Sequence, residues 1–106
     1  MKTIKSLVTM PYAQARVITE DNFIKLKSYD TIVIIIDKAS GWVQCTGTYS
    51  QTTRKHISAF CEEITNGTIN YQLMKQIAKD KMLYNLYTSE VVDIDKVGAI
   101  IWYKLQ

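Results

Sequence analysis

The stretch TIVIIIDKASGWVQCTGTY, residues 31–49, indicates the fold class because it has the pattern of a β-hairpin. Residues 31–36 are all β-branched, as is typical of a strand in the middle of a sheet. The polar segment DKASG at 37–41 is typical of a turn, and residues 42–49 supply a returning strand. We therefore expect residues 31–36 and 42–49 to pair as an antiparallel hairpin.

The residues before the hairpin also favour strands. In FIKLKSY, residues 23–29, Ile24 and Leu26 alternate with Lys25 and Lys27, which predicts a strand with one wet face. Residues 5–10, which end at Pro11, and residues 13–19 are predicted as two further short strands.

After the hairpin the apolar period changes from two residues to that of an α-helix. Ile57, Phe60, Cys61 and Ile64 lie at i, i+3, i+4 and i+7, so we expect a helix over 52–64 that packs on the sheet through this stripe. Gly67 is suited to the left-handed conformation after its last turn.

A second helix is predicted over 70–82, followed by a segment whose pattern is less regular. The residues that this helix would bury are Leu73, Met74, Ile77 and Ala78. Residues 83–90 fit either a separate helical turn or a loop, and VGAIIWYKL at 97–105 predicts a final strand. The expected architecture is α+β, a small antiparallel sheet packed against two helices, in one domain of 106 residues.

Composition bounds the chemistry. Thirteen Lys and Arg against ten Asp and Glu give a net charge of +3, a weak drive toward nucleic acid and the wrong sign for a DNA mimic. Cys45 and Cys61 lack CxxC spacing and are accompanied by a single His, so we expect two buried reduced thiols and neither a metal nor a cofactor. No stretch approaches eighteen apolar residues, and the N-terminal apolar run is too short for a signal peptide, so we expect a cytoplasmic protein with no membrane association.

The richest polar segment is YSQTTRKH at 49–56, and it admits two interpretations. The hydroxyl groups of Ser50, Thr52 and Thr53 are all suited to capping a helix, and His56 lies at the edge of the apolar stripe as a candidate packing residue. The same first turn, with Arg54 and Lys55, also has the components of an anion or nucleic-acid binding site. Cations at a helix N-terminus are mildly unfavourable unless an anion offsets them, which favours the second interpretation weakly.

Catalysis is not expected. His56 is the single candidate for a general base, and the sequence marks neither an orienting group nor an oxyanion hole. Asp93 and Asp95 supply too few oxygen ligands for a Ca²⁺ loop, and phosphate-binding or nucleophile-elbow motifs are missing.

SYDTIV at 28–33 followed by YSQTTRKHISAF at 49–60 resembles a group of small bacteriophage-encoded proteins of unassigned function. In that group a Tyr-Asp/Asn-Thr-Ile-Val strand precedes a Tyr-Ser-x-Thr-Thr-x-Lys-His helix start. The matching residues here are Tyr29, Asp30, Thr31, Ile32, Val33, Tyr49, Ser50, Thr52, Thr53, Lys55, His56 and Phe60. The resemblance implies a phage context and no particular mechanism.

A phage context favours an interaction module that engages a host protein, such as an anti-defence, anti-restriction or anti-CRISPR inhibitor. Tyr and Trp dominate protein interfaces, and the aromatic residues available outside the motif are Tyr71, Tyr84, Tyr87, Trp102 and Tyr103. The alternative is direct nucleic-acid or phosphate binding through the helix start, assisted by Lys75, Lys79 and Lys81. Protein binding ranks first because a net charge of +3 is small.

Overall fold

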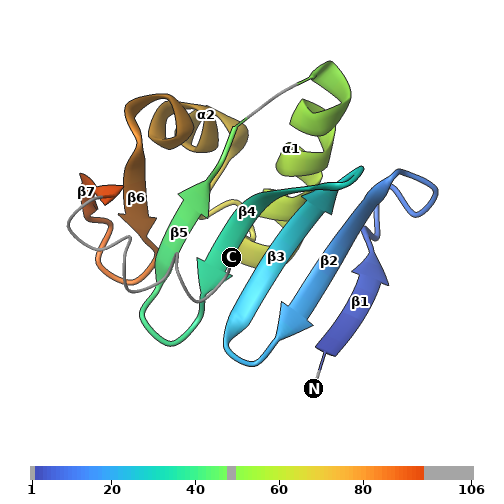
Figure 1. Cartoon of the computed structure of the whole chain (residues 1–106), viewed down its shortest axis with the longest axis horizontal. Coiled ribbons are helices and arrows are strands. Elements are labelled where there is room, and N and C mark those ends of the chain that lie inside the picture. The colour runs from blue at the N-terminus through green and yellow to red at the C-terminus, as the bar shows by residue number, and fades with distance from the viewer. Residues whose placement is uncertain (1, 48–49, 95–106) are drawn as a thin grey trace.

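The computed structural model describes residues 2–47 and 50–94. These residues form a seven-stranded antiparallel sheet whose strands follow one another in sequence order, with two helices inserted between the fifth and sixth strands (Figure 1). The strands are β1 (Lys2–Ser6), β2 (Ala15–Glu20), β3 (Phe23–Ser28), β4 (Thr31–Asp37), β5 (Trp42–Cys45), β6 (Met82–Asn85) and β7 (Val91–Asp93), and the helices are α1 (Gln51–Thr65) and α2 (Tyr71–Asp80). The α+β expectation is confirmed.

The central hairpin is confirmed with a shorter second strand. β4 is the fourth of the seven strands and carries four consecutive buried residues, as a middle strand should. β5 ends at Cys45, so the prediction of strand for residues 46 and 47 was wrong, and residues 48–49 lie outside the described part. Leu26 of β3 pairs with Ile34 of β4 and Lys27 pairs with Ile32, so Val33 is skipped and forms a β-bulge.

Gly41 ends the turn between β4 and β5 in a conformation that other residues rarely adopt. Its φ is +88°, and a Cβ atom there would lie 2.6 Å from the ring of Tyr87. The buried side chain of Asn85 ties the same region together, because it donates to the Ser40 carbonyl and accepts from the Tyr87 and Thr88 amides.

The two N-terminal strands differ in extent from their prediction. β1 ends at Ser6, and residues 7–10 belong to the loop before β2. The side chain of Leu7, the first residue of this loop, is fully buried in the core. Glu63 of α1 then accepts hydrogen bonds from the amides of Val8 and Thr9, at 2.7 and 3.0 Å, which holds the loop away from the sheet ladder.

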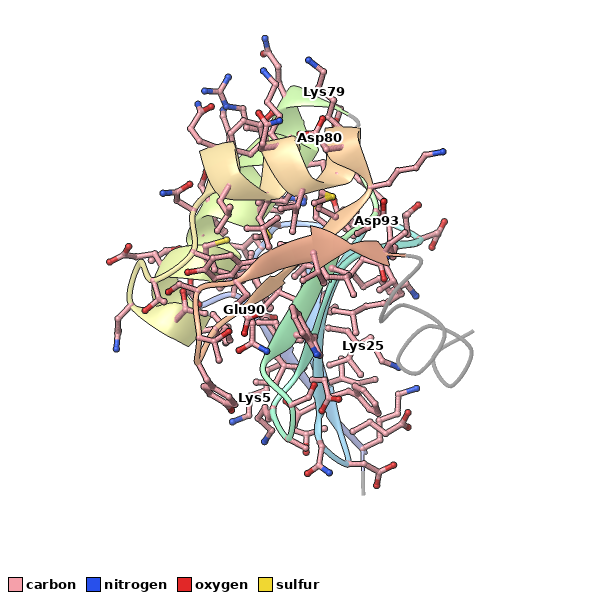
Figure 2. The ribbon with its side chains drawn as sticks, turned by 90° about the vertical axis from the view of Figure 1, so that its left-hand side faces the viewer. Lys5, Lys25, Lys79, Asp80, Glu90 and Asp93 are labelled. Carbon is pink, nitrogen blue, oxygen red and sulfur yellow. The ribbon has the colours of Figure 1, made fainter. Side chains whose placement is uncertain are left out.

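Both helices lie on the same face of the sheet (Figure 2). Ile57, Phe60 and Cys61 are buried between α1 and the sheet, and Ile64 is half-buried, so the predicted stripe is confirmed. Lys79 and Asp80 of α2 point away from the sheet in Figure 2.

The ends of the helices follow from their capping residues. α1 begins after its N-cap Ser50, and Asn66 takes the left-handed conformation (φ 52°) at its C-terminus with Gly67 following at φ +82°. α2 begins after its N-cap Asn70 and stops at Asp80, two residues before the predicted end, because Lys81 is left-handed (φ 53°) and reverses the chain.

The chain after α2 returns to the sheet. β6 occupies residues 82–85 with alternating burial, so the expectation of a helical turn or loop was wrong over Leu83–Asn85. The helical wheel places Leu83 away from the apolar face of α2, and in β6 the same side chain is fully buried. Strands do follow the helices as predicted, whereas the predicted strand at 97–105 lies outside the described residues.

The antiparallel order brings three distant connections to one end of the sheet, the upper end in Figure 1. These are the β1–β2 loop, the β3–β4 turn and the chain that enters α1. The Tyr29 amide donates to the Gln14 carbonyl at 2.7 Å, which joins the first two.

Candidate functional site

The start of α1 is capped as its hydroxyl-rich sequence predicts. The Ser50 side chain accepts a hydrogen bond from the Thr53 amide at 3.2 Å, and the Ser50 carbonyl accepts from the Arg54 amide at 2.9 Å. No acidic residue occupies the first turn, so the positive end of the helix dipole is not neutralised there.

A chain of hydrogen bonds continues from this cap into the core. The Ser50 hydroxyl donates to the Thr53 hydroxyl oxygen at 3.2 Å, the Thr53 and Ser28 hydroxyl oxygens are 3.0 Å apart, and Ser28 Oγ lies 2.8 Å from His56 Nδ1. These contacts are mutually compatible if Thr53 donates to Ser28 and Ser28 donates to Nδ1 of a neutral His56. We call Ser28, Ser50, Thr53 and His56 the hydroxyl–histidine cluster.

Burial assigns a structural role to this cluster. Ser28, Thr53 and His56 are each no more than 3% exposed. Burial also lowers the pKa of His56 from its ordinary value of 6.5, which keeps the imidazole neutral at pH 7. The Ser28–His56 distance would suit a nucleophile and its base, but both groups are covered, and among the described residues no carboxylate is bonded to the imidazole.

The remaining polar residues of the α1 start face solvent. Thr52, Arg54 and Lys55 are exposed, and a hollow of about 450 Å³ is lined by Gln51, Arg54, Lys55 and Ser58. The Arg54 guanidinium carbon lies 4.7 Å from the centre of the Tyr71 ring, a cation–π contact that links α1 to α2. Lys75, Lys79 and Lys81 are also exposed. The six residues predicted as one anion site therefore divide into a buried group and an exposed group.

The described tyrosines of the predicted protein interface differ in their exposure. Tyr71 and Tyr84 are half-buried and pack against the core. Tyr87 is 64% exposed, and its hydroxyl donates to the Lys38 carbonyl at the lower end of the sheet. Trp102 and Tyr103 lie outside the described residues.

A different set of apolar side chains is exposed together at the upper end of the sheet. Val8 and Tyr12, from the β1–β2 loop, are 81% and 97% exposed, and Tyr29, from the β3–β4 turn, is 50% exposed. We call these three residues the loop patch. Sequence analysis missed Val8 and Tyr12, and it identified Tyr29 only through the SYDTIV resemblance.

Tyr29 connects the loop patch to the hydroxyl–histidine cluster. Its backbone is left-handed (φ 54°), which is uncommon for an aromatic residue, and its ring centre lies 5.8 Å from that of His56. The buried imidazole thus supports one side of an exposed tyrosine.

Metal-ligand groups, membrane-spanning helices and cysteines were considered for residues 2–47 and 50–94. No group of three or more His, Cys, Asp and Glu side chains there is arranged to hold a metal ion. Across the same residues, every helix is too short or too polar to cross a membrane. Cys45 and Cys61 are free and buried, as predicted, and burial raises the pKa of Cys45 to about 11 and that of Cys61 to about 12.

Comparison with known proteins gives one match. No curated protein and no solved structure matches the chain. The model of a family of unknown function, DUF8033, matches residues 1–81. Because this match covers most of the 106 residues, the chain belongs to the DUF8033 family of unknown function.

Proposed function

We propose that the protein is a non-enzymatic interaction module that binds a partner protein through the loop patch. The observation that carries this proposal is the exposure of Val8, Tyr12 and Tyr29 on two loops that a backbone hydrogen bond joins. Large apolar groups gathered at the surface favour a protein contact, and tyrosine is prominent among residues that dominate binding energy.

The loops that carry the patch are held in place by hydrogen bonds. The Glu63 carboxylate accepts from the Val8 amide and from both the amide and the hydroxyl of Thr9. Arg16 Nη1 donates to the Ala13 and Ala15 carbonyls at 2.9 and 2.7 Å. A surface ordered before binding loses less conformational entropy when a partner docks, which favours affinity.

The partner class follows from the resemblance to phage-encoded proteins. A host protein is the first candidate partner. The corresponding role in the host cytoplasm is inhibition of a defence system, for instance of its restriction or CRISPR components. The exposed cations Arg54 and Lys55 precede His56, which contacts Tyr29, so an acidic rim on the partner would complement this end of the molecule.

The second candidate is direct binding of nucleic acid or phosphate at the hollow between Gln51, Arg54, Lys55 and Ser58. Its support is the combination of two exposed cations with a helix N-terminus that has no acidic residue in its first turn. Lys75 and Lys79 of α2 and Lys81, which follows α2, are exposed and would extend the positive surface.

An affinity capture from host lysate with matched variants separates the two candidates. The double variant Val8→Ser, Tyr12→Ser removes the exposed apolar area, and Tyr87→Ser removes an exposed tyrosine at the opposite end. We expect wild type and Tyr87→Ser to retain one partner protein after nuclease treatment and the double variant to lose it. Retention by the double variant at unchanged thermal stability would contradict the proposal.

A salt titration by fluorescence anisotropy tests the second candidate. If Arg54 and Lys55 grip phosphate, each alanine variant should flatten the plot of log K against log salt by about 0.9 for duplex DNA and about 0.7 for a single strand. Affinity should fall evenly across sequences, because phosphate contacts do not read bases. Unchanged slopes in both variants would show that these cations only flank the helix start.

A further inference from the structure

The face of the sheet opposite α1 and α2, which we call the open face, carries a row of paired residues. Lys25 of β3 pairs with Ile18 of β2 and with Ile35 of β4, and Ile35 in turn pairs with Gln44 of β5. Directly paired residues of antiparallel strands point to the same face. Figure 2 shows Lys25 on the side of the sheet away from both helices, so its partners also belong to the open face.

The row continues to both edges of the sheet. Val43 pairs with Tyr84, which packs against the helix-side core, so the adjacent Leu83 points to the open face. Leu83 pairs with Val92 of β7, and Ile18 pairs with Ile4 of β1. The open-face row therefore crosses all seven strands and consists of Ile4, Ile18, Lys25, Ile35, Gln44, Leu83 and Val92.

The middle of the open-face row is buried as deeply as the main core. Ile18, Ile35 and Leu83 are 8%, 5% and 0% exposed, yet none of them belongs to the cluster between the sheet and the helices. The side chain of Lys25 is only 16% exposed, whereas Ile4 on the edge strand is 58% exposed. Side chains on a sheet face without a covering layer remain in contact with water. This burial therefore requires a layer over β2 to β6.

The position and length of residues 95–106 suit them to supply this layer. Among residues 2–47 and 50–94, the two helices lie outside the sheet, and both pack on its other face. Residues 95–106 follow Ile94, directly after β7, the strand at which the row ends. The distance from β2 to β6 is four strand spacings, about 19 Å. A segment of this length, when extended, reaches about 40 Å, which is enough to cross the row.

We propose that residues 95–106 pack over the open-face row as a third layer, with the apolar stretch AIIWY at 99–103 set against Ile18, Ile35 and Leu83. The low exposure of these three side chains arises within one chain, which favours a segment of the same chain over a second copy. The open face is then closed to partner proteins. This inference is independent of the proposed partner contact, and it leaves the loop patch as the apolar surface at which a partner can dock.

Methyl NMR on the full-length protein tests the contact directly. With the Ile, Leu and Val methyl groups labelled, we expect NOEs between residues 95–106 and the methyl groups of Ile18, Ile35 and Leu83. The methyl groups of Ile57 and Ile77, which α1 and α2 bury on the other face, are the control and should show none. Lack of NOEs to the three open-face residues would overturn the proposal. NOEs that arise only between chains in a mixed labelled and unlabelled sample would assign the face to a second copy and overturn it too.

A pair of full-length variants completes the test. Ile101→Ser combined with Trp102→Ser removes apolar side chains at two adjacent positions, so it weakens the contact whichever of them faces the row. We expect this variant to lose the open-face NOEs and to bind more of the dye ANS, because an apolar face becomes accessible. Tyr12→Ser, which removes an exposed aromatic ring, should match wild type in both measurements. Retained NOEs and unchanged ANS fluorescence in the double variant would contradict the proposal, and the wild-type NOEs decide it even if that variant fails to fold.

Discussion

At the start of α1, the hydroxyls of Ser28 and Thr53 and the imidazole of His56 are buried and bonded to one another, with separations of 3.0 and 2.8 Å. On β5, the amide oxygen of Gln44 is also buried, but it has no hydrogen-bond partner. Both regions stand at the same end of the sheet, and both carry polar groups that the sequence places on otherwise apolar elements. The difference teaches that burial alone does not mark a site. A polar cluster whose members bond to one another stabilises the fold, whereas a buried acceptor without a donor destabilises it.

The largest test removes the anchor that brings the hydroxyl–histidine cluster together. Phe60 is fully buried one turn after His56, and it holds α1 against the sheet that carries Ser28. Phe60→Ala should lower the free energy of unfolding by about 3 to 5 kcal/mol, near the whole stability of many small domains. Urea denaturation measures this, and a loss below about 1 kcal/mol would contradict the packing of α1.

The second test breaks the cluster itself. Ser28→Ala leaves His56 Nδ1 and the Thr53 hydroxyl without their buried partner, so we expect a loss of about 1 to 3 kcal/mol in the free energy of unfolding. Ser58→Ala, on the exposed face of α1, is a control for the serine-to-alanine change. Equal small effects of both substitutions would mean that the cluster contributes nothing.

Removing the buried polar group of Gln44 on β5 should have the opposite sign. Gln44→Leu replaces an unpaired buried acceptor with an apolar group, and we expect the free energy of unfolding to rise by about 1 kcal/mol. Thermal denaturation compares this variant with wild type. Destabilisation comparable with that of Ser28→Ala would show that the Gln44 amide is needed by the fold and would remove the contrast between the two regions.

The cap of α1 should contribute less than the buried part of the cluster. Ser50→Ala removes the acceptor for the Thr53 amide and should lower stability by about 1 kcal/mol. Partner capture at saturating protein should not change, since the loop patch does not include Ser50. A lost partner at unchanged melting temperature would instead make the helix start functional.

The smallest expected effect is a pH dependence carried by His56. Because burial lowers the pKa of His56 below 6.5, the imidazole binds a proton at a higher pH in the unfolded chain than in the native protein. Stability should therefore be complete at about pH 7.5 and fall as the pH drops through 6.5 toward the native pKa. His56→Gln should flatten urea denaturation curves across this window, and an unflattened profile would assign the loss to another group.

Glu63 titrates in a separate, more acidic window. Burial alone would raise its pKa, but hydrogen bonds from Thr9 and Val8 outweigh this and lower it from the ordinary value of 4.5. The stability that Glu63 contributes is present above pH 4.5 and is lost as the pH falls through the native pKa, so it does not obscure the His56 window.

The sequence by itself determined the elements whose cause is local. The period of two placed β3 and the period of 3.6 placed α1, because side-chain direction follows directly from backbone geometry, and the run of β-branched residues placed β4. The burial of Phe60 followed from the helical period, and the cap at Ser50 is one of the three hydroxyl residues predicted as caps. The end of α2 was less so, since Lys81 carries no glycine-like signal for its left-handed conformation.

Tertiary structure alone decided which distant groups meet. Ser28 and His56 lie 28 positions apart, and Gln44 reads as an ordinary strand residue until the fold buries its amide oxygen without a donor. Likewise, the side chain of Tyr84 packs against the core, whereas that of Tyr12 is exposed, although both are tyrosines. Periodicity reports which side of its own element a residue occupies, whereas partners and exposure depend on what the other elements place against that side.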